Sequence, residues 1–518
     1  MSWKKEIDEI FKRRLLALGQ GGESAVAKHH AKGKLTARER ILCLLDPATF
    51  KEFGSIAGTP EFSADGSLEK FTPANYIIGL GKIHDRTVAV GAEDFTLKGG
   101  SPNAAGLRKS MYAEHLAIDY KVPLVRLLEG GGGSVKKEGN DAPKTSGDPL
   151  FGSPRFTIIA DAMGKIPVVS AALGPVAGFP AGRLVSSHFS VMTKETSQIM
   201  IAGPAVVKRA LGIDITKEQL GGSQIHAHSG IIDNLACSEE DAFQQIKTFL
   251  SYLPNNVWEK APRLHNDDPV DRCDQTLSNL VPTNRRRSYN IRKILESIVD
   301  RESLFEISPS FGPGLTIALA RLNGQPVGIT ANNCNYNAGA MTAQTAQKMR
   351  RLIELCEIFH LPIVNFVDEP GFMIGPDAEK AGTIRYGMAA VAAASQATVP
   401  WASVRIRKSY GVASAAHFGP NSYILDWPSV ESGALPVEGG VAVAFHRKIA
   451  AAENPEALRN ELENQLLDSQ SPFSASESFS SHEIIDPAET RPHLCQWVDW
   501  VQPKLGKMLG ETTFSVRP

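Results

Sequence analysis

The sequence predicts an α/β fold made of two similar halves, and two observations support this. Apolar stretches of strand length alternate with longer stretches of helical periodicity along most of the 518-residue chain, as in sheets buried between helices. In addition, Pro123 in KVPLV and Pro362 in HLPIV are 239 positions apart (362 − 123 = 239). Glu129 and Asp368, in the same two strands, keep that offset (368 − 129 = 239). One offset held in separate motifs indicates an internal duplication.

The expected elements of the first half run in the order strand, strand, glycine turn, helix, strand, glycine turn. IGLGKI and TVAVGAE are apolar strands joined as a hairpin, and KGGS follows as the first glycine turn. AAGLRKSMYAEHLAIDY has the spacing of a helix over 104–120, and PLVRLLE at 123–129 is the next strand. This strand leads into GGGG at 130–133, the second glycine turn.

The second half repeats this order. IALARLNGQPVGITANN is the hairpin, and a helix is expected over 338–360. PIVNFVDE at 362–369 is the strand, followed by the turn PGFMIG. A further strand is expected in each half, and it ends in Gly178 and Gly411 respectively, with an offset of 233 (411 − 178 = 233). Both halves are therefore expected to carry two turns of the same kind.

The segments outside the repeat predict a helix at the start of the chain and a connecting segment near its middle. Residues 4–18 form an amphipathic pattern that is expected to pack on the body or on another subunit. Thr36 and Glu39 have the spacing of a capping box. The stretch 255–288 is rich in Pro, Asn and Asp, and its NRRRS run is expected to be a solvated linker. We expect one domain over 1–265 and another over 275–518.

Composition and charge exclude several classes of protein. A formal net charge of −1 gives no whole-molecule field for nucleic acid. No apolar stretch is long enough to cross a membrane, and the first eighteen residues contain acidic side chains and no apolar signal core, so we expect a cytoplasmic protein. No cysteines are spaced as CxxC, which argues against a zinc ribbon. His226 and His228 would share one face of a strand, but no third ligand is evident, so we expect no metal site.

Glycine turns that join a strand to a helix suggest a site for a negatively charged oxygen. Glycine lets the backbone approach a ligand closely, and free N–H groups at the start of a helix favour an anion. Such turns suit a phosphate site or an oxyanion hole. The sequence has no G-x-x-x-x-G-K-[ST] motif and no G-x-G-x-x-G with a suitably placed acidic partner, so an ATP P-loop and a dinucleotide fold are not supported.

Longer motifs resemble one family in order along the chain. GKLTARER followed by LLDPATFKEF is similar to the start of the carboxyltransferase (beta) subunits of biotin-dependent acyl-CoA carboxylases, as in propionyl-CoA carboxylase. The resemblance continues over residues 30–450 through FTLKGGS, GPVAGFPAG, TSQIMIAGPAVVK, QLGGSQIH, FVDEPGFMIGPDAEKAGTIRYG and RKSYG. It implies two tandem crotonase-like (ClpP/crotonase) β-β-α superhelical domains.

The resemblance also implies a reaction. A carboxyl group would move from carboxybiotin, carried by a separate subunit, to the α-carbon of a short or branched, propionyl-CoA-like acyl-CoA. Negative charge would develop on the thioester oxygen, as an enolate, and on the biotin ureido oxygen. Two backbone oxyanion holes would stabilise these charges without a side-chain base. The family usually forms a hexamer, so we expect a homo-hexamer core with a biotin carboxylase or biotin carboxyl carrier partner.

Carried over onto this sequence, the resemblance implies specific site residues. One oxyanion hole falls on the N–H groups of Gly131 and Gly132, and the other on those of Val412 and Ala413. The substrate-binding residues would be Lys98, Gly99, Gly100, Gly178, Phe179, Gly371, Phe372, Tyr410 and Gly411.

Three departures from the family pattern fall at the expected site. Gly133-Ser134 replaces the usual Ala-Arg, Phe179-Pro180 replaces Gly-Ala, and Val412 stands where a second glycine is usual. Valine keeps its N–H, but it needs a negative φ to avoid strain, which makes the geometry of that turn a question for the structure. Because all three changes lie where substrate would bind, we expect an acyl group other than plain propionyl.

Three alternatives remain open. The chain could serve a biotin-dependent decarboxylase complex that runs the same chemistry backwards. It could be a crotonase-type hydratase or thioesterase, with Glu129 or Asp368 as a base, or a non-catalytic scaffold for a biotin protein. No AMKM-like biotin attachment motif or ATP-binding module is visible, so we expect biotin to be supplied in trans.

Overall fold

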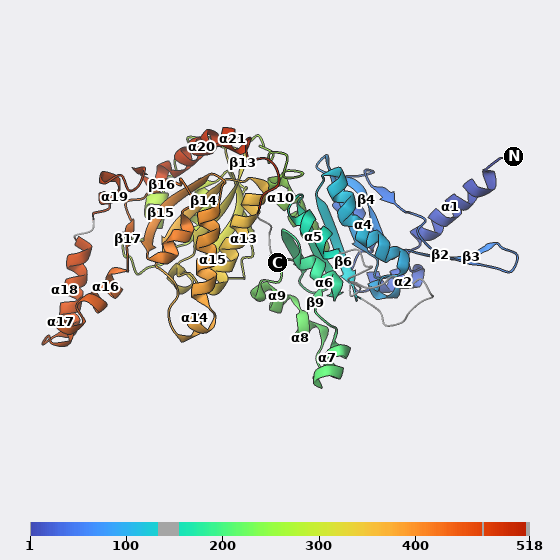
Figure 1. The fold of residues 1–518 in the computed structure, drawn as a ribbon, viewed down its shortest axis with the longest axis horizontal. Helices are drawn as coiled ribbons and strands as arrows, with labels where there is room; N and C mark the ends of the chain where they lie inside the picture. The colour runs from blue at the N-terminus through green and yellow to red at the C-terminus, as the bar shows by residue number, and fades with distance from the viewer. Residues whose placement is uncertain (1, 133–154, 469–470, 514–518) are drawn as a thin grey trace. The chain divides into compact units, whose positions relative to one another are not determined.

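The computed structural model describes residues 2–132, 155–468 and 471–513. Two compact units make up the chain, residues 1–259 with 511–518 and residues 260–510. Figure 1 shows their helices and strands along the chain. Gly133 and Ser134, one of the departures from the family pattern, lie outside the described residues. Among the described helices, none combines the length and the apolar character that a membrane crossing requires.

The first unit is built on a mixed sheet. Its strand order is β1-β4-β5-β6-β7-β8-β10, with the short strand β9 paired to the end of β7. The β1–β4 and β4–β5 pairs are antiparallel and the later pairs are parallel. The bounds are β1 (Lys51–Phe53), β4 (Tyr76–Ile83), β5 (Arg86–Glu93), β6 (Leu124–Gly130), β7 (Val168–Ala177), β8 (Phe189–Thr193), β9 (Gln198–Met200) and β10 (Asn234–Ala236). A separate hairpin pairs β2 (Gly58–Phe62) with β3 (Leu68–Pro73).

The second unit repeats that sheet strand for strand. Its order is β11-β12-β13-β14-β15-β16-β18, and the short strand β17 pairs with the end of β15 as β9 does with β7. Even the irregularity recurs, since Gly130 pairs with Val176 after a register shift and Glu369 pairs with Ser409 after another. The bounds are β11 (Phe305–Ile307), β12 (Leu315–Leu322), β13 (Gln325–Asn332), β14 (Ile363–Glu369), β15 (Trp401–Tyr410), β16 (Tyr423–Asp426), β17 (Glu431–Gly433) and β18 (Glu483–Ile484). The prediction of two similar α/β halves is confirmed.

The long helix of each unit begins and ends in the same way. Asn103 caps α4 (Ala104–Tyr120) and Thr342 caps α13 (Ala343–Phe359), each accepting a backbone N–H with its side chain. Both helices stop at a left-handed residue, Lys121 with φ 53° and His360 with φ 55°. These end signals keep the offset of 239 (342 − 103 and 360 − 121). The repeat therefore includes the helix termini as well as the strands.

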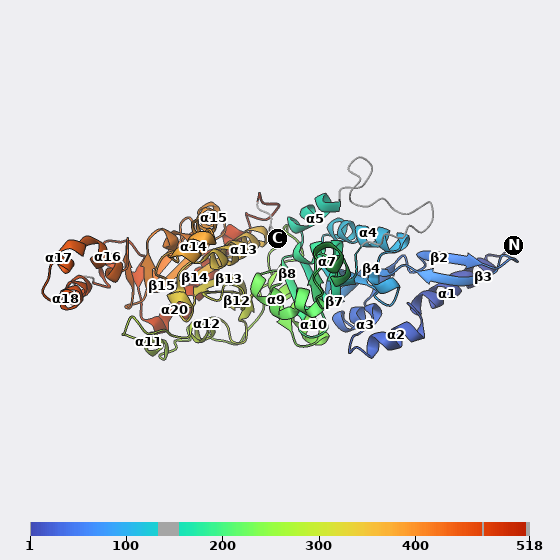
Figure 2. The same ribbon diagram turned by 90° about the horizontal axis from the view of Figure 1, so that it is seen from below.

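Helices cover both faces of each sheet. In Figure 2, α13 and α15 lie along one side of the strands of the second unit, and α12 and α20 lie along the other. Ile294, Leu295, Leu494 and Val498, from α12 and α20, are fully buried against the strands. The helices not yet given are α1 (Lys4–Leu18), α2 (Glu23–His30), α3 (Ala37–Leu44), α5 (Arg155–Met163), α6 (Phe179–Val185), α7 (Pro204–Leu211), α8 (Lys217–Gly221), α9 (Ser223–Ser229), α10 (Glu239–Tyr252), α11 (Leu277–Leu280), α12 (Ile291–Ile298), α14 (Pro376–Lys380), α15 (Thr383–Gln396), α16 (Val437–Ala444), α17 (His446–Ala450), α18 (Pro455–Asp468), α19 (Ser474–Glu477), α20 (Thr490–Trp500) and α21 (Gln502–Leu505), with the 3₁₀ turns η1 (Lys98–Gly100), η2 (Asn337–Gly339), η3 (Val412–His417) and η4 (Pro487–Glu489).

Two expectations for the connecting segments can be compared with the structure. The capping box is present, since Thr36 N donates to Glu39 Oε2 at 2.7 Å and Glu39 N to Thr36 Oγ1 at 3.4 Å. The NRRRS run is exposed at four of its five residues, as expected of a solvated linker, but it also makes specific contacts with the sheet. Arg285 pairs with Glu431 at 2.5 Å, and the carbonyl of Arg287 accepts from Arg407. The first contact connects the run to β17, and the second connects it to β15.

Candidate functional site

Each unit has one turn in which a long strand passes directly into a helix. Gly178 follows β7 with φ 65° and ψ −130°, and Gly411 follows β15 with φ 63° and ψ −163°. A positive φ with an extended ψ is nearly confined to glycine, which explains the residue type at both places. Gly178 N donates to Met200 O at 3.3 Å and Gly411 N to Gly433 O at 3.0 Å, so each turn is held by its short neighbouring strand.

The second turn presents main-chain donors. Val412 and Ala413 are the first two residues of η3, and the N–H groups at the start of a helix have no acceptor inside the helix. Val412 does not have a positive φ, because the preceding residue, Gly411, takes the unusual conformation. The valine is therefore compatible with this turn. Val412 is 58% exposed, whereas Ala413 is buried.

The first turn differs at one chemically decisive position. Pro180 corresponds to Ala413 by the local offset (413 − 180 = 233) and is the second residue of α6. Proline has no N–H, so this position cannot donate. The two turns share a backbone path but do not offer the same set of donors.

The first group of predicted glycines is brought together around Gly178. Gly132 has φ 76°, and a Cβ on it would stand 2.8 Å from Ala177 O and 3.6 Å from Gly178 Cα. Gly131 N donates to Gly99 O at 3.3 Å. A Cβ on Gly100 would come within 2.4 Å of Glu129 O. The glycines of three segments therefore pack backbone to backbone, and the N–H of Gly131 already has an acceptor inside the protein.

The second group is arranged around the turn after β14. Gly371 N donates to Glu369 Oε1 at 3.0 Å, and Gly371 O accepts from Met341 N at 3.0 Å. The ring of Phe372 packs against α15, where a Cβ on Gly387 would stand 2.2 Å from it. Gly371 corresponds to Gly132 (371 − 132 = 239), and both have positive φ.

The remaining predicted side chains differ in their exposure. Tyr410 is fully buried, and its hydroxyl donates to Glu431 Oε2 at 3.3 Å. Phe179 lies edge-on to Phe156 at 5.8 Å and lines a small cavity between α4 and α5. Lys98 is exposed at the start of η1 with φ 51°. Tyr410 is thus a buried residue that supports the adjacent turn at Gly411, whereas Lys98 is exposed to solvent.

The two acidic residues at the strand ends are buried in ion pairs. Glu129 contacts Lys34, Arg40 at 2.7 Å and His29 at 3.5 Å. Its side chain has no solvent exposure. Burial lowers the pKa of Lys34 below its usual value. A carboxylate paired with two buried cations, Lys34 and Arg40, serves to compensate their charge.

Asp368 is held in the same manner by different partners. It contacts Arg407 at 2.8 Å and accepts the Tyr289 hydroxyl at 2.9 Å. Sequence reasoning placed both acids but missed their partners, because Lys34, Arg40 and Tyr289 lie outside the repeated segments and Arg407 of β15 has Gly174 at its place in the first unit (407 − 233 = 174). The offset of 239 was the only signal that linked Glu129 with Asp368.

Two further buried acids occur beside the turns. Glu93 Oε2 accepts the Glu129 N–H at 2.9 Å, as Asn332 Oδ1 accepts that of Asp368 at 3.1 Å. Burial raises the pKa of Glu93 to about 7. Burial also raises the pKa of Glu369. Neither residue was singled out from sequence, because a single acid at a strand end gives no local signal.

The histidine pair belongs to a helix, so the expectation of a strand was wrong. His226 and His228 lie on α9, where residues two apart do not share a face. His226 Nε2 bonds Ile199 O at 2.7 Å, and His228 Nδ1 bonds Gln224 O at 2.9 Å. Within residues 2–132, 155–468 and 471–513, no three His, Cys, Asp or Glu side chains are grouped to hold a metal ion.

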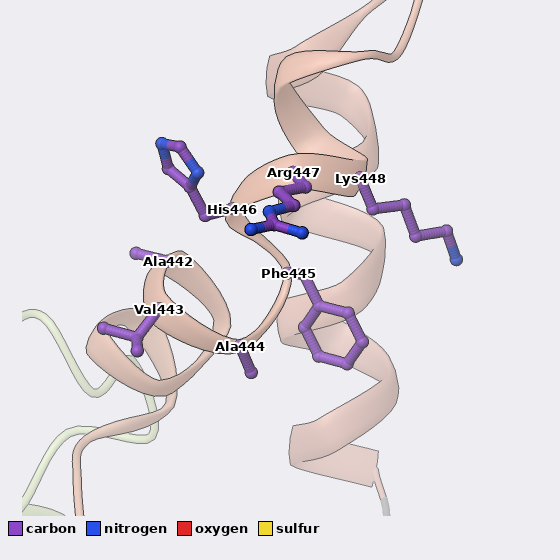
Figure 3. A pocket seen from close by; sticks show the side chains of 7 residues that line it. All are labelled: Ala442, Val443, Ala444, Phe445, His446, Arg447 and Lys448. Atoms are coloured by element: carbon purple, nitrogen blue, oxygen red, sulfur yellow. The ribbon is translucent and has the colours of Figure 1, made fainter.

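An open hollow of about 630 Å³ lies apart from these turns in the second unit. Figure 3 shows its lining from the α16–α17 bend, where the side chains of His446 and Lys448 point in different directions. The hollow is lined by residues 442–448 and includes none of the predicted site residues. We therefore place the candidate site at the turns.

Comparison with known proteins agrees with this architecture. The carboxyl transferase domain model matches residues 28–504. The propionyl-CoA carboxylase carboxyltransferase subunit of Haloferax mediterranei is 34% identical over 501 residues, 95% of each chain. The methylmalonyl-CoA decarboxylase subunit alpha of Veillonella parvula is 32% identical over 493 residues, 94% of each chain.

A solved structure gives the same result for the fold. The transcarboxylase 12S subunit, with methylmalonyl-CoA bound, superposes with a TM-score of 0.86 at 29% identity and covers 100% of this chain and 97% of its own. The family match and the fold identify the chain as a carboxyltransferase, an enzyme made of two crotonase-like domains. The chain belongs to the carboxyl transferase domain family, which it matches over nearly its whole length.

Proposed function

We propose that this carboxyltransferase moves a carboxyl group between carboxybiotin, presented by a separate carrier subunit, and the α-carbon of a short or branched acyl-CoA. The observation that carries the proposal is the pair of equivalent turns at Gly178 and Gly411, each at the start of a helix. The relatives named for propionyl-CoA and methylmalonyl-CoA support the acyl-CoA class.

The reaction requires an anion to be stabilised as it forms. Removal of an α-proton from a thioester places negative charge on the thioester oxygen. Main-chain donors that are already oriented stabilise such charge without reorganising, and one donor contributes about 3–4 kcal/mol. We assign this role in the second unit to the N–H groups of Val412 and Ala413. Biotin, when bound, supplies the carboxyl group and the ureido oxygen.

The first unit would hold the second anion. Gly131 and Gly132 remain the predicted donors there, although Gly99 O competes for the Gly131 N–H. Gly178 and Phe179 border the same place and, with Lys98, Gly99 and Gly100, would contact substrate. Gly371, Phe372, Tyr410 and Gly411 would shape the site in the second unit.

The expected assembly follows the relatives. The transcarboxylase 12S structure was solved as a hexamer, and this chain matches it throughout. We therefore expect six copies in solution, which light scattering would measure. Methylmalonyl-CoA decarboxylase is also among the relatives, so a biotin-dependent decarboxylase complex is the second candidate.

A pair of variants tests the anion-binding role of the second turn. Val412→Pro removes one N–H at the first helical position, where proline fits the backbone, and Val412→Ala keeps that N–H while shortening the side chain. We expect Val412→Pro to lower kcat for biotin-dependent decarboxylation of methylmalonyl-CoA by about 10²–10³-fold, as loss of one oxyanion donor does. Val412→Ala should stay within about threefold of the unmodified enzyme, because its N–H is retained.

The substrate panel would contain malonyl-CoA, methylmalonyl-CoA and longer or branched homologues, each with free biotin. Biotin-dependent turnover of one member would support the chemistry and identify the acyl group. If no member reacts while biotin carrier protein still binds, the carboxyltransferase mechanism is overturned in favour of a scaffold.

A further inference from the structure

Glu431 joins three segments of the second unit beneath the anion-binding turn. Its Oε2 lies 2.5 Å from Arg285 Nη2 and accepts the Tyr410 hydroxyl at 3.3 Å. The side chains of Arg285 and Glu431 are 16% and 17% exposed, and Tyr410 is fully buried. An ion pair so largely removed from water depends on its geometry more than an exposed pair does.

Glu431 begins the strand that fixes the turn. β17 pairs with the end of β15 in the register Lys408–Glu431, Ser409–Ser432 and Tyr410–Gly433. Gly433, its last residue, accepts the N–H of Gly411 at 3.0 Å. A strand of three residues forms few backbone hydrogen bonds, so side-chain contacts contribute much of what keeps it in register.

The Arg285–Glu431 ion pair interacts with other ionisable side chains around it. Burial is the main cause that raises the pKa of Tyr410, and the Glu431 carboxylate adds to it. Glu438 on α16 approaches Arg285 at 3.9 Å. Among the described residues, Nε and Nη1 of Arg285 are buried and have no hydrogen-bond acceptor. Glu431 is therefore the principal compensation for this guanidinium.

The first unit keeps the turn without these side chains. Gln198 and Ala177 occupy the places of Glu431 and Tyr410 (431 − 198 and 410 − 177 both equal 233). Gln198 Nε2 instead donates to Glu218 at 3.2 Å. Both units share the pairing of a short strand with the end of a long one, but the contacts from Glu431 to Arg285 and Tyr410 occur in the second unit alone.

We propose that Arg285, Glu431 and Tyr410 are positioning residues that set the turn at Gly411 by fixing β17, and we call them the β17 clamp. Their effect on catalysis rests on the proposed function, in which the N–H groups after Gly411 hold the anion. Their effect on the position of the turn does not depend on that function. None of the three side chains is assigned a contact with the reacting atoms.

The test uses the full-length protein and a matched control. Glu431→Gln removes the clamp charge with little change of shape. Glu306→Gln removes a similar pair, Glu306–Arg292 at 2.6 Å, from β11 at the far edge of the same sheet. Tyr410→Phe removes only the hydroxyl. Hydrogen exchange would be followed in peptides covering 408–417 and 429–435, with 175–185 of the first unit as an internal reference.

We expect Glu431→Gln to speed exchange in both peptides by about tenfold, because local opening becomes easier, while the reference peptide and Glu306→Gln stay unchanged. With methylmalonyl-CoA and free biotin, kcat should fall by about tenfold to a hundredfold through misplacement of the donors, with KM nearly constant. Tyr410→Phe should change both quantities in the same direction and by less.

The outcomes separate the two proposals. Unchanged exchange in both peptides of Glu431→Gln would overturn the clamp, whatever the activity. Faster exchange in an enzyme whose unmodified form shows no biotin-dependent turnover would support the clamp and count against the proposed function. Equal loss of kcat in Glu431→Gln and Glu306→Gln would show a general loss of stability and overturn the positioning role.

Discussion

The carboxylate of Glu369 and the imidazole of His417 lie 3.3 Å apart in the core of the second unit, and both side chains are at most 1% exposed. The other carboxylate oxygen, Oε1, accepts the N–H groups of Met341 and Gly371. Glu369 therefore links the turn after β14 to the end of η3. In the first unit Gly130 and Leu184 occupy these positions (369 − 239 and 417 − 233), so the link is particular to one half.

The Glu369 link gives a stability prediction. In Glu369→Gln the amide oxygen can still accept the two N–H groups, but the amide nitrogen would replace Oε2, which now accepts Asn332 Nδ2 at 3.2 Å, so two buried donors would face each other. We expect a loss of about 1–3 kcal/mol in the free energy of unfolding, measured by urea denaturation. Glu306→Gln provides the comparison at a more exposed site. Equal stability of the Glu369 and Glu306 variants would count against this account.

Glu93 gives a prediction for pH dependence. Its pKa is raised from 4.5 to about 7, mainly by burial, with Arg183 and Glu129 as the charged groups that also act on it. A raised carboxyl pKa stabilises the fold below the unfolded value of 4.5, and this contribution is lost as pH rises through about 7. Relative to Glu93→Gln, the unmodified protein should lose about 3 kcal/mol between these limits.

Urea unfolding at several pH values between 4.5 and 8 would measure this difference, with both proteins followed in parallel. Glutamine keeps an acceptor for the Glu129 N–H, so the two proteins differ chiefly in the titrating group. Parallel pH profiles would mean that Glu93 does not titrate in this range.

A variant of Glu129 would distinguish a structural role of this buried acid from a catalytic role. Glu129→Gln would leave Lys34 and Arg40 buried without their shared counter-ion, although Arg40 keeps Glu239 at 2.7 Å. We expect a loss of about 3–5 kcal/mol in the free energy of unfolding. A stable variant that loses acyl-CoA hydration or thioester hydrolysis would instead favour Glu129 as a catalytic base.

Replacement of Pro180 gives a prediction for an increase in kcat. Pro180→Ala would place an N–H where Ala413 has one in the second unit, on a backbone path that already exists. Gly132, one of the donors assigned to the first unit, packs against Gly178, so the new N–H would lie beside the proposed anion site. Because one well-placed donor contributes about 3–4 kcal/mol, we expect kcat to rise by about tenfold or more. Ala181→Gly, one residue further along α6, serves as a control for local loosening of the helix. An unchanged kcat in Pro180→Ala would show that the missing donor does not limit the reaction.

The repeat explains how much could be predicted from sequence. The order of strands, glycine turns and long helices along the chain follows from local patterns that recur at a fixed offset, whereas the caps at Asn103 and Thr342 were not predicted. The partners of the buried charges do not. Arg40 pairs with Glu239 across 199 positions, and Arg285 reaches Glu431 across 146. No short-range pattern reports such pairs, so the NRRRS run could not be distinguished from a polar linker.

Local ambiguity accounts for the error at His226 and His228. The segment SQIHAHS is short, and apolar and polar residues alternate in it much as they do in a strand. Gly222 and Gly230 bound it as helix ends, with Gly230 left-handed at φ 77°. Reading those glycines as caps would have given the helix.

In the proposed mechanism the turn after Gly411 acts through its main chain, and this separates the choice of acyl group from the chemistry. The N–H of Val412 belongs to the backbone, and the residue is 58% exposed. Substitution there can reshape the mouth of the site while leaving the donor in place. A catalytic side chain cannot be exchanged in this way, because its substitution removes the reacting group itself. Under the proposed function, the residue type at position 412 can therefore alter acyl preference while the anion donor is kept.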